Sequence, residues 1–345
     1  MTWAKRNKIA PQSVFYLLFI SRVAAFILLS FQGAEPDSGL LVSVILSIPA
    51  GLVLSVPAIL CVSKRKNPLE SGCVSGIYGV LFSAYTGVAV YELTLFCRYA
   101  LGAYSKNVIL AVMIIAAVCY CASLGIEGVS RFSGFAFLLF AGGITVLLAL
   151  NFSEGEVIRI MPISLDKTSA VNRTVFISTS MSELAAYLSV SRRVNGKSAK
   201  PVVLFELLSG GVILLIGVTV FAVLGAAAQS FAYPVFTLSQ TATIGGFERL
   251  DAIFSSVFIL AGFLRCALFG YCAVSSFRTE KGKTSAFFCG ALSLFAYFIL
   301  IITNAKQDYV NIFHTATFAV FAVLLPLLWL IFKKRNAGDE LIETL

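Results

Sequence analysis

The sequence predicts an all-α polytopic membrane protein with ten transmembrane helices, and three observations lead to this class. Of the 345 residues, 59% are hydrophobic and only 12% are charged, whereas soluble domains carry about 25% charged residues. The mean hydropathy is +0.92. Apolar runs of about 20 residues recur along the whole chain, each long enough to cross the hydrocarbon core as a helix. We therefore expect a single transmembrane domain over residues 1–345.

The first apolar run, 14–31, follows Lys5, Arg6 and Lys8 and resembles the core of a signal peptide. It is long for such a core and is followed by a poor cleavage site, so we expect an uncleaved first span. The predicted spans are 14–31, 39–62, 76–101, 108–124, 132–150, 175–190, 202–228, 250–277, 285–302 and 309–332. They divide into two groups of five, 14–150 and 175–332, followed by an acidic tail at 336–345.

Lysine and arginine are concentrated in alternate loops of this arrangement. The basic segments are the N-terminus, 64–66, Arg131, 192–200, 278–283 and 333–335. Because basic residues accumulate on the cytoplasmic side, we expect both termini in the cytoplasm, with 154–173 and 233–246 outside. The segment 233–246 is too polar to cross the bilayer. We expect a short outer helix that lies over the bundle as a lid, or a surface connection without that role.

The composition excludes several functional classes. The chain has one histidine, His314, and eight cysteines without a CxxC or Cys/His pattern, so we expect no metal site, no cofactor and no enzymatic triad. The net charge of +9 lies in short loops between spans. It therefore indicates attraction to membrane lipids and not to nucleic acid.

A run of polar residues interrupts the sixth predicted span. It contains Ser178, Thr179, Ser180, Ser182 and Glu183. Such groups are costly at bilayer depth unless they face protein or a cavity, so the run is a candidate wall of a binding site. The 16 residues of this span reach about 24 Å as a helix, short of the roughly 30 Å core. We expect an unwound break that binds a ligand. Alternatively, the hydroxyls bond to carbonyls of their own helix.

Four charged residues lie near the middle of predicted spans 1, 3, 6 and 8, namely Arg22, Glu92, Glu183 and Arg265, with Ser21 beside the first. In transporters built from two inverted five-helix repeats, the site lies at mid-membrane between the broken first helices of the two halves. Each such charge costs about 2.5 to 3.5 kcal/mol on insertion scales. We therefore expect them to pair with each other, bringing Glu183 to Arg22 or Arg265, or with a charged ligand. A salt-bridge cluster that only fixes helix packing is the alternative.

Several motifs carry a resemblance to a known family. They are the segment LGIEGVSR at 124–131, the Tyr233-Pro234 turn followed by GFERLD at 246–251, Arg265, and Pro326 followed by the basic run 333–335. In these segments, which span nearly the whole chain, the sequence resembles the spore germination protein family. Its members are the integral-membrane B subunits of nutrient germinant receptors in endospore-forming bacteria.

The resemblance implies membership of the amino acid/polyamine/organocation superfamily and a LeuT-type fold with a 5+5 inverted repeat. It further implies a binding site for an amino acid or similar small nutrient between spans 1, 3, 6 and 8. The implied partners are an A-type membrane subunit and a C-type lipoprotein, and the location is the spore inner membrane or the bacterial cell membrane. One departure is Arg22, which stands where relatives have a glycine-containing break.

Two other functions stay open at this point. The chain is alternatively a secondary transporter for amino acids or polyamines that acts alone. As a third possibility, it is a pore or structural subunit in which the charges form a gate and no ligand binds. Because the sequence has no large domain outside the membrane, any output of a receptor has to pass through partner chains.

Overall fold

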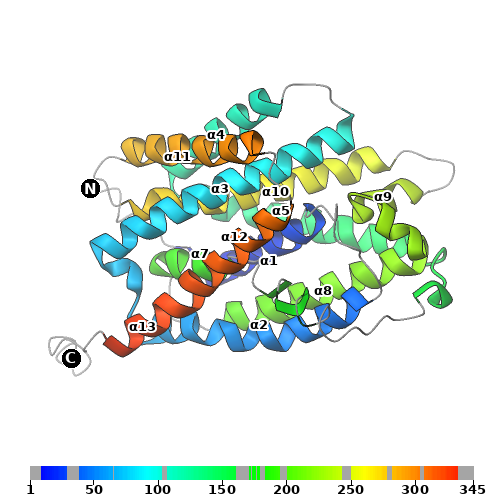
Figure 1. Cartoon of the computed structure of the whole chain (residues 1–345), viewed down its shortest axis with the longest axis horizontal. Helices are drawn as coiled ribbons and strands as arrows, with labels where there is room; N and C mark the ends of the chain where they lie inside the picture. The colour runs from blue at the N-terminus through cyan, green and yellow to red at the C-terminus, as the bar shows by residue number, and fades with distance from the viewer. Residues whose placement is uncertain are drawn as a thin grey trace.

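The computed structural model describes residues 9–28, 39–64, 66–102, 107–160, 171, 173–175, 177–178, 183–194, 200–242, 250–277, 282–303 and 307–332. Long helices dominate these residues and run roughly along one direction (Figure 1). The helices of the first half are α1 (Pro11–Leu28), α2 (Gly39–Ser63), α3 (Gly72–Leu101), α4 (Asn107–Leu124) and α5 (Ile126–Asn151). Those of the second half are α7 (Glu183–Val190), α8 (Lys200–Leu224), α9 (Pro234–Thr241), α10 (Asp251–Ser276), α11 (Gly282–Ile302), α12 (Gln307–Phe318) and α13 (Leu325–Phe332).

The predicted class, an all-helical membrane protein, is confirmed. Within the described residues, nine helical segments are long and apolar enough to cross a membrane. They correspond to nine of the ten predicted spans and begin or end within a few residues of the predicted bounds, the largest difference being at α5. The remaining span, 175–190, contains the short helix α7 and part of a stretch that the structure does not describe. The total of ten spans stays a prediction.

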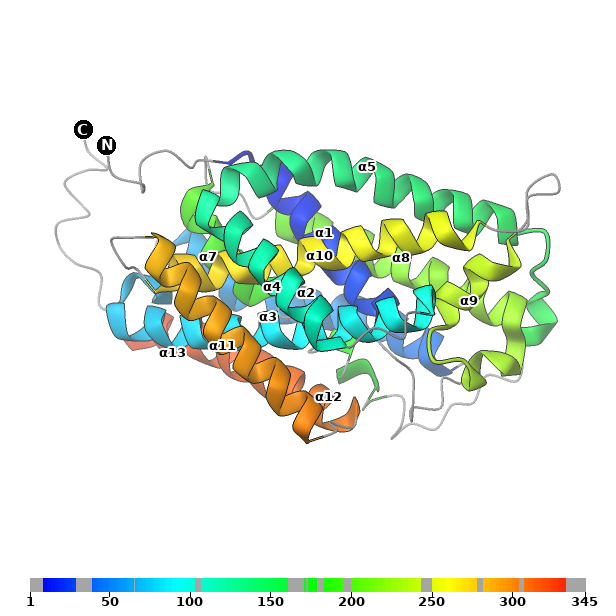
Figure 2. The ribbon, with the colours of Figure 1, turned by 90° about the horizontal axis from the view of Figure 1, so that it is seen from above.

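Helix α1 lies in the middle of the bundle (Figures 1 and 2). In its apolar window 78% of residues are buried, against 17% for the last span at 309–332. It packs against α10, α8 and α5. Residues Pro11–Leu28 form one continuous α-helix, in keeping with the departure at Arg22 from the glycine-containing break of relatives. Any ligand site beside α1 therefore has to use side chains of this segment, because its backbone groups are engaged in the helix.

The last span changes helix type in its middle. Residues Ala319–Leu324 form a π-helical turn between α12 and α13. Pro326 has no backbone N–H and cannot continue the regular ladder, which is a common cause of such an irregularity. The Phe321 carbonyl in this turn accepts a hydrogen bond from the Tyr78 hydroxyl at 2.6 Å. The irregular turn thus ties the last span to α3 through a side chain.

The segment after α8 forms a short 3₁₀ turn, Gly225–Ser230, and then α9. Helix α9 packs against α5, α8 and α10. Its Thr241 hydroxyl donates to Asn151 Oδ1 at 3.0 Å, and the ring of Tyr233 at its start contacts Phe96 and Tyr99 of α3. Burial raises the pKa of the Tyr233 hydroxyl, with a smaller contribution from the charge of Glu92. The predicted short helix therefore exists over 234–241, and its outer location stays a prediction, while 243–249 lies outside the described residues.

Candidate functional site

The candidate site is a cluster of buried charges that joins α3, α7, α10 and α12. Arg265, near the middle of α10, donates from Nη1 to Glu92 Oε2 of α3 at 2.5 Å. Its Nε lies 3.9 Å from Glu183 Oε1, at the start of α7. His314 Nε2 of α12 lies 3.4 Å from the other oxygen of Glu92. Arg265 therefore stands between two carboxylates, and the cluster links helices that are far apart in the sequence.

Helix α1 reaches the same cluster through Ser21. The Ser21 hydroxyl donates to Glu183 Oε1 at 2.7 Å, so this oxygen accepts from Ser21 and faces Arg265. The second oxygen, Oε2, is buried and has no hydrogen-bond partner among the described residues, and Glu183 as a whole is 0% exposed. An unsatisfied buried carboxylate oxygen costs free energy and calls for an explanation.

A second buried ion pair lies on the other side of α1. Arg22 Nη1 donates to Glu206 Oε2 of α8, and the guanidinium lies over the Phe205 ring at 5.2 Å from its centroid. Gly51 of α2 faces this pair, and a Cβ atom there would lie 2.6 Å from Glu206 Oε2. The Arg22–Glu206 pair thus occupies the space that a side chain at position 51 would fill.

The structure brings four of the nine predicted site residues together. Ser21, Glu92, Glu183 and Arg265 lie in one connected cluster. Glu183 lies within salt-bridge reach of Arg265, one of the two expected partners. Arg22, the other partner considered for Glu183, pairs with Glu206 instead. Neighbouring residues of one helix point in different directions, so Ser21 and Arg22 serve different clusters.

The polar run in the sixth span is described only in part. The Ser178 hydroxyl donates to the Thr174 carbonyl at 2.7 Å, which is the bond to its own helix considered as the alternative. Thr179, Ser180 and Ser182 lie outside the described residues, as does the expected break at this position. Their role as ligand-binding residues stays a prediction.

Two members of these clusters were missed by sequence reasoning, namely Glu206 and His314. Glu206 lies near the start of a predicted span, where charged side chains commonly reach water, yet it is 2% exposed. His314 was considered only as a triad or metal residue. A lone histidine in an apolar span was the available signal, because an ionisable residue inside a membrane usually has a partner.

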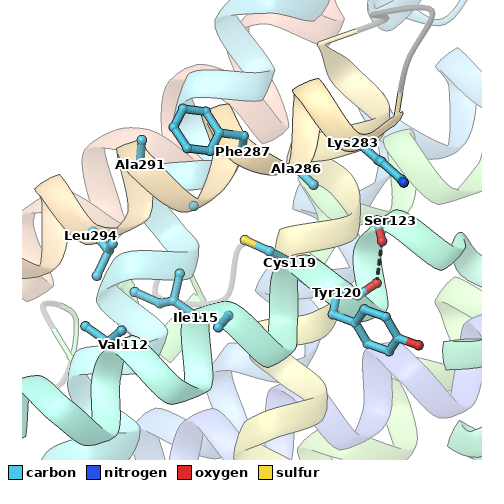
Figure 3. A pocket seen from close by; sticks show the side chains of 12 residues that line it. Val112, Ile115, Cys119, Tyr120, Ser123, Lys283, Ala286, Phe287, Ala291 and Leu294 are labelled. Atoms are coloured by element: carbon cyan, nitrogen blue, oxygen red, sulfur yellow. Dashed lines mark hydrogen bonds between the residues drawn. The ribbon is translucent and has the colours of Figure 1, made fainter.

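Two grooves on the outside of the bundle are of a different kind. One, of about 520 Å³, runs between α4 and α11 and is lined almost entirely by apolar side chains such as Ile115, Phe287 and Leu294, with Lys283 at one end (Figure 3). The other, of about 700 Å³, lies between α3, α11 and α12. Such linings suit lipid chains and offer few polar groups to a water-soluble nutrient. The charged cluster is therefore the better candidate for a polar ligand.

Comparisons with known proteins add a family and a fold. A family model described as spore germination protein matches residues 73–309. The chain belongs to the spore germination protein family. The resemblance noted in the sequence is confirmed by this match. No curated protein matches the chain.

Solved structures extend the likeness of this spore germination family member to transporters. A Na⁺-coupled sialic acid symporter in a substrate-bound outward-open state is 13% identical, with 97% of this chain and 82% of that chain covered and a TM-score of 0.64. A manganese transporter of Eremococcus coleocola, in complex with an aromatic bis-isothiourea substituted compound, is 11% identical, with 99% and 87% covered and a TM-score of 0.53. A mutant of the same transporter is 10% identical, with 96% of this chain and 81% of that chain covered and a TM-score of 0.51. At these identities the likeness shows the fold alone, which is that of LeuT-type transporters.

Proposed function

We propose that this chain is the membrane-embedded B subunit of a nutrient germinant receptor and that it binds a small nutrient, such as an amino acid, at mid-membrane. The observation that carries the proposal is the cluster of Ser21, Glu92, Glu183 and Arg265 inside a member of the spore germination protein family. Buried charges on separate helices are costly, and in membrane proteins they commonly mark binding sites.

The architecture behind this proposal is a pair of inverted five-helix repeats, 14–150 and 175–332, with an acidic tail at 336–345. In support, the helices that carry the cluster are the first, third, sixth and eighth spans of the predicted order. α1 contacts α7 and α10, and α3 contacts α10. A site enclosed by these four helices opens to one side or the other when the repeats move against each other.

The signal of such a subunit has to reach other chains. We propose an A-type membrane subunit and a C-type lipoprotein as partners, in the spore inner membrane, with both termini of this chain in the cytoplasm. Deleting the gene in its spore-forming host tests the receptor role. Spores without it should lose germination with a specific nutrient, while germination triggered without nutrients persists. Unchanged germination with every nutrient that the parent spores respond to would contradict the proposal.

A secondary transporter is the second candidate, favoured by the likeness to a Na⁺-coupled symporter over 97% of this chain. Uptake of labelled amino acids or amines into proteoliposomes that contain only this protein separates the two functions. Substrate accumulation driven by an ion gradient would favour the transporter, whereas binding without accumulation favours the receptor subunit. If no compound binds and the ion pairs serve only packing, the third possibility, a structural or pore subunit, remains.

A further inference from the structure

The charges buried inside the bundle do not balance. Among the described residues, the buried acidic side chains are those of Glu92, Glu183 and Glu206, and the buried arginines are Arg22 and Arg265. In their ionised forms these five side chains sum to one negative charge. An uncompensated charge in a low-dielectric interior is expensive, so one positive charge is missing from this inventory.

Both buried guanidinium groups already have carboxylate partners, although the Nε atom of each makes no hydrogen bond within the described part of the chain. Arg22 is paired with Glu206, and Arg265 is paired with Glu92 and also faces Glu183. A ligand carboxylate entering this region would therefore meet no unpaired guanidinium among the described residues. It would also lie near three carboxylates of the protein, which repel it.

The missing positive charge would lie beside the Glu183 carboxylate. Its Oε1 accepts from Ser21 and faces Arg265, while its Oε2 is buried and has no hydrogen-bond partner. Glu183 shares Arg265 with Glu92, whose contact at 2.5 Å is much closer than the 3.9 Å to Glu183. Hydrogen bonds that involve an ionised group are the strong ones, and a charged N–H donor would satisfy Oε2.

The remaining ways to supply a positive charge fit less well. No group of three or more His, Cys, Asp or Glu side chains that could hold a metal ion exists among the described residues, so these side chains do not offer the several oxygen ligands that a bare divalent cation requires. A proton on His314 would neutralise the sum, but His314 contacts Glu92 at 3.4 Å, which leaves Glu183 Oε2 without a partner. An ammonium group would both compensate the negative charge and donate a hydrogen bond to Glu183 Oε2.

We infer that the central site takes a small amine that carries one positive charge and no free carboxylate, with its ammonium group on Glu183 Oε2. This inference rests on the proposed nutrient-binding function and sharpens it. An ordinary α-amino acid is zwitterionic and leaves the excess negative charge in place. Its amide or ester, or a simple monoamine, brings the single positive charge that the cluster lacks.

The test compares matched acid and amide pairs on the full-length protein in lipid nanodiscs by isothermal titration calorimetry at neutral pH. Suitable pairs are glycine and glycinamide, L-alanine and L-alaninamide, and L-phenylalanine and L-phenylalaninamide. The members of a pair share the ammonium group and side chain and differ in the carboxylate. We expect the amide of at least one pair to bind about tenfold or more tightly than its acid, the scale of one charged hydrogen bond.

Three variants test whether the ammonium group binds at Glu183. Glu183→Gln should weaken amide binding by about tenfold to a hundredfold, whereas Glu127→Gln, at the exposed Glu127–Arg131 pair of α5, should leave it unchanged. If Glu183→Gln does not fold, Glu183→Asp keeps the charge and should retain the preference for the amide at lower affinity.

Each outcome decides between the inference and its rivals. An acid that binds as tightly as its amide overturns the inference and leaves the proposed nutrient binding intact. If neither acids nor amides bind, both the inference and the proposed function fail. Unchanged amide binding by Glu183→Gln would overturn the assignment of the ammonium group to Glu183, as would competitive displacement of the amide by sodium.

Discussion

Arg22 and Glu206 form an ion pair between α1 and α8 in which both side chains are almost fully buried. The pair joins the central helix to the second half of the chain, 184 residues further along the sequence. A buried pair adds little stability compared with apolar residues, but removing one partner leaves an uncompensated charge in the interior. Its two members should therefore depend on each other.

This dependence gives the first prediction. Arg22→Leu should destabilise the folded protein by about 3 to 5 kcal/mol, because Glu206 then stays buried without a partner. Adding Glu206→Leu should recover most of the loss. Apparent melting temperature and abundance in the membrane measure both effects.

A matched control tests the identity of the partner. Adding Glu183→Gln to Arg22→Leu should bring no recovery, since Glu183 contacts Arg265 and Ser21. If this combination recovers as well as Arg22→Leu with Glu206→Leu, the Arg22–Glu206 pairing is wrong, and Arg22 neutralises Glu183, which is one of the two pairings considered from the sequence.

The second prediction concerns Gly51. In Gly51→Ala the new Cβ would lie 2.6 Å from Glu206 Oε2, so the carboxylate has to move away from Arg22. We expect a loss of about 1 to 3 kcal/mol, the usual cost of overpacking. Gly142→Ala on α5 is the control, because nothing lies within 4 Å of its Cβ position. A higher melting temperature for Gly51→Ala than for Gly142→Ala would contradict the described geometry.

The helices were predictable, because a run of apolar residues long enough to cross the membrane has few alternatives to a helix. The helix partners were predictable only in part. Charges at the centre of a span cannot reach water, so Glu92, Glu183 and Arg265 were expected to meet. Glu206 was not expected, because a charge near the end of a span usually reaches the interface, and only the packing of α8 against α1 and α2 encloses it.

Other features have no sequence signal of their own. The π-helical turn at Ala319–Leu324 lies next to Pro326, and the Tyr78 hydroxyl of another helix donates a hydrogen bond to the Phe321 carbonyl in this turn. Whether Ser178 serves a ligand or its own helix also depends on side-chain direction, which sequence spacing does not determine. Side-chain direction also decides that Ser21 and Arg22, which are adjacent in the sequence, belong to two different clusters.

The third prediction tests orientation in the membrane with a native thiol. All eight cysteines are free, and among them Cys73, at the start of α3, is the exposed one. The loop before α3 is predicted to be cytoplasmic, so a membrane-impermeant maleimide should label Cys73 only after the cells are opened. In Ser153→Cys, after α5, the new thiol should be labelled in intact cells. Labelling of Cys73 in intact cells would reverse the assigned orientation.

The last prediction concerns the position of Arg265 between two carboxylates. Arg265→Gln leaves Glu92 and Glu183 without a guanidinium partner, and we expect a loss of about 3 to 5 kcal/mol. Glu92→Gln added to this variant should restore part of it, because one of the two unpaired carboxylates is then neutral. Unfolding midpoints of the two single variants and the double variant form a cycle. Because the residues are in contact, the effects should not add, and an additive result would show that the 2.5 Å contact between Arg265 and Glu92 contributes nothing to the fold.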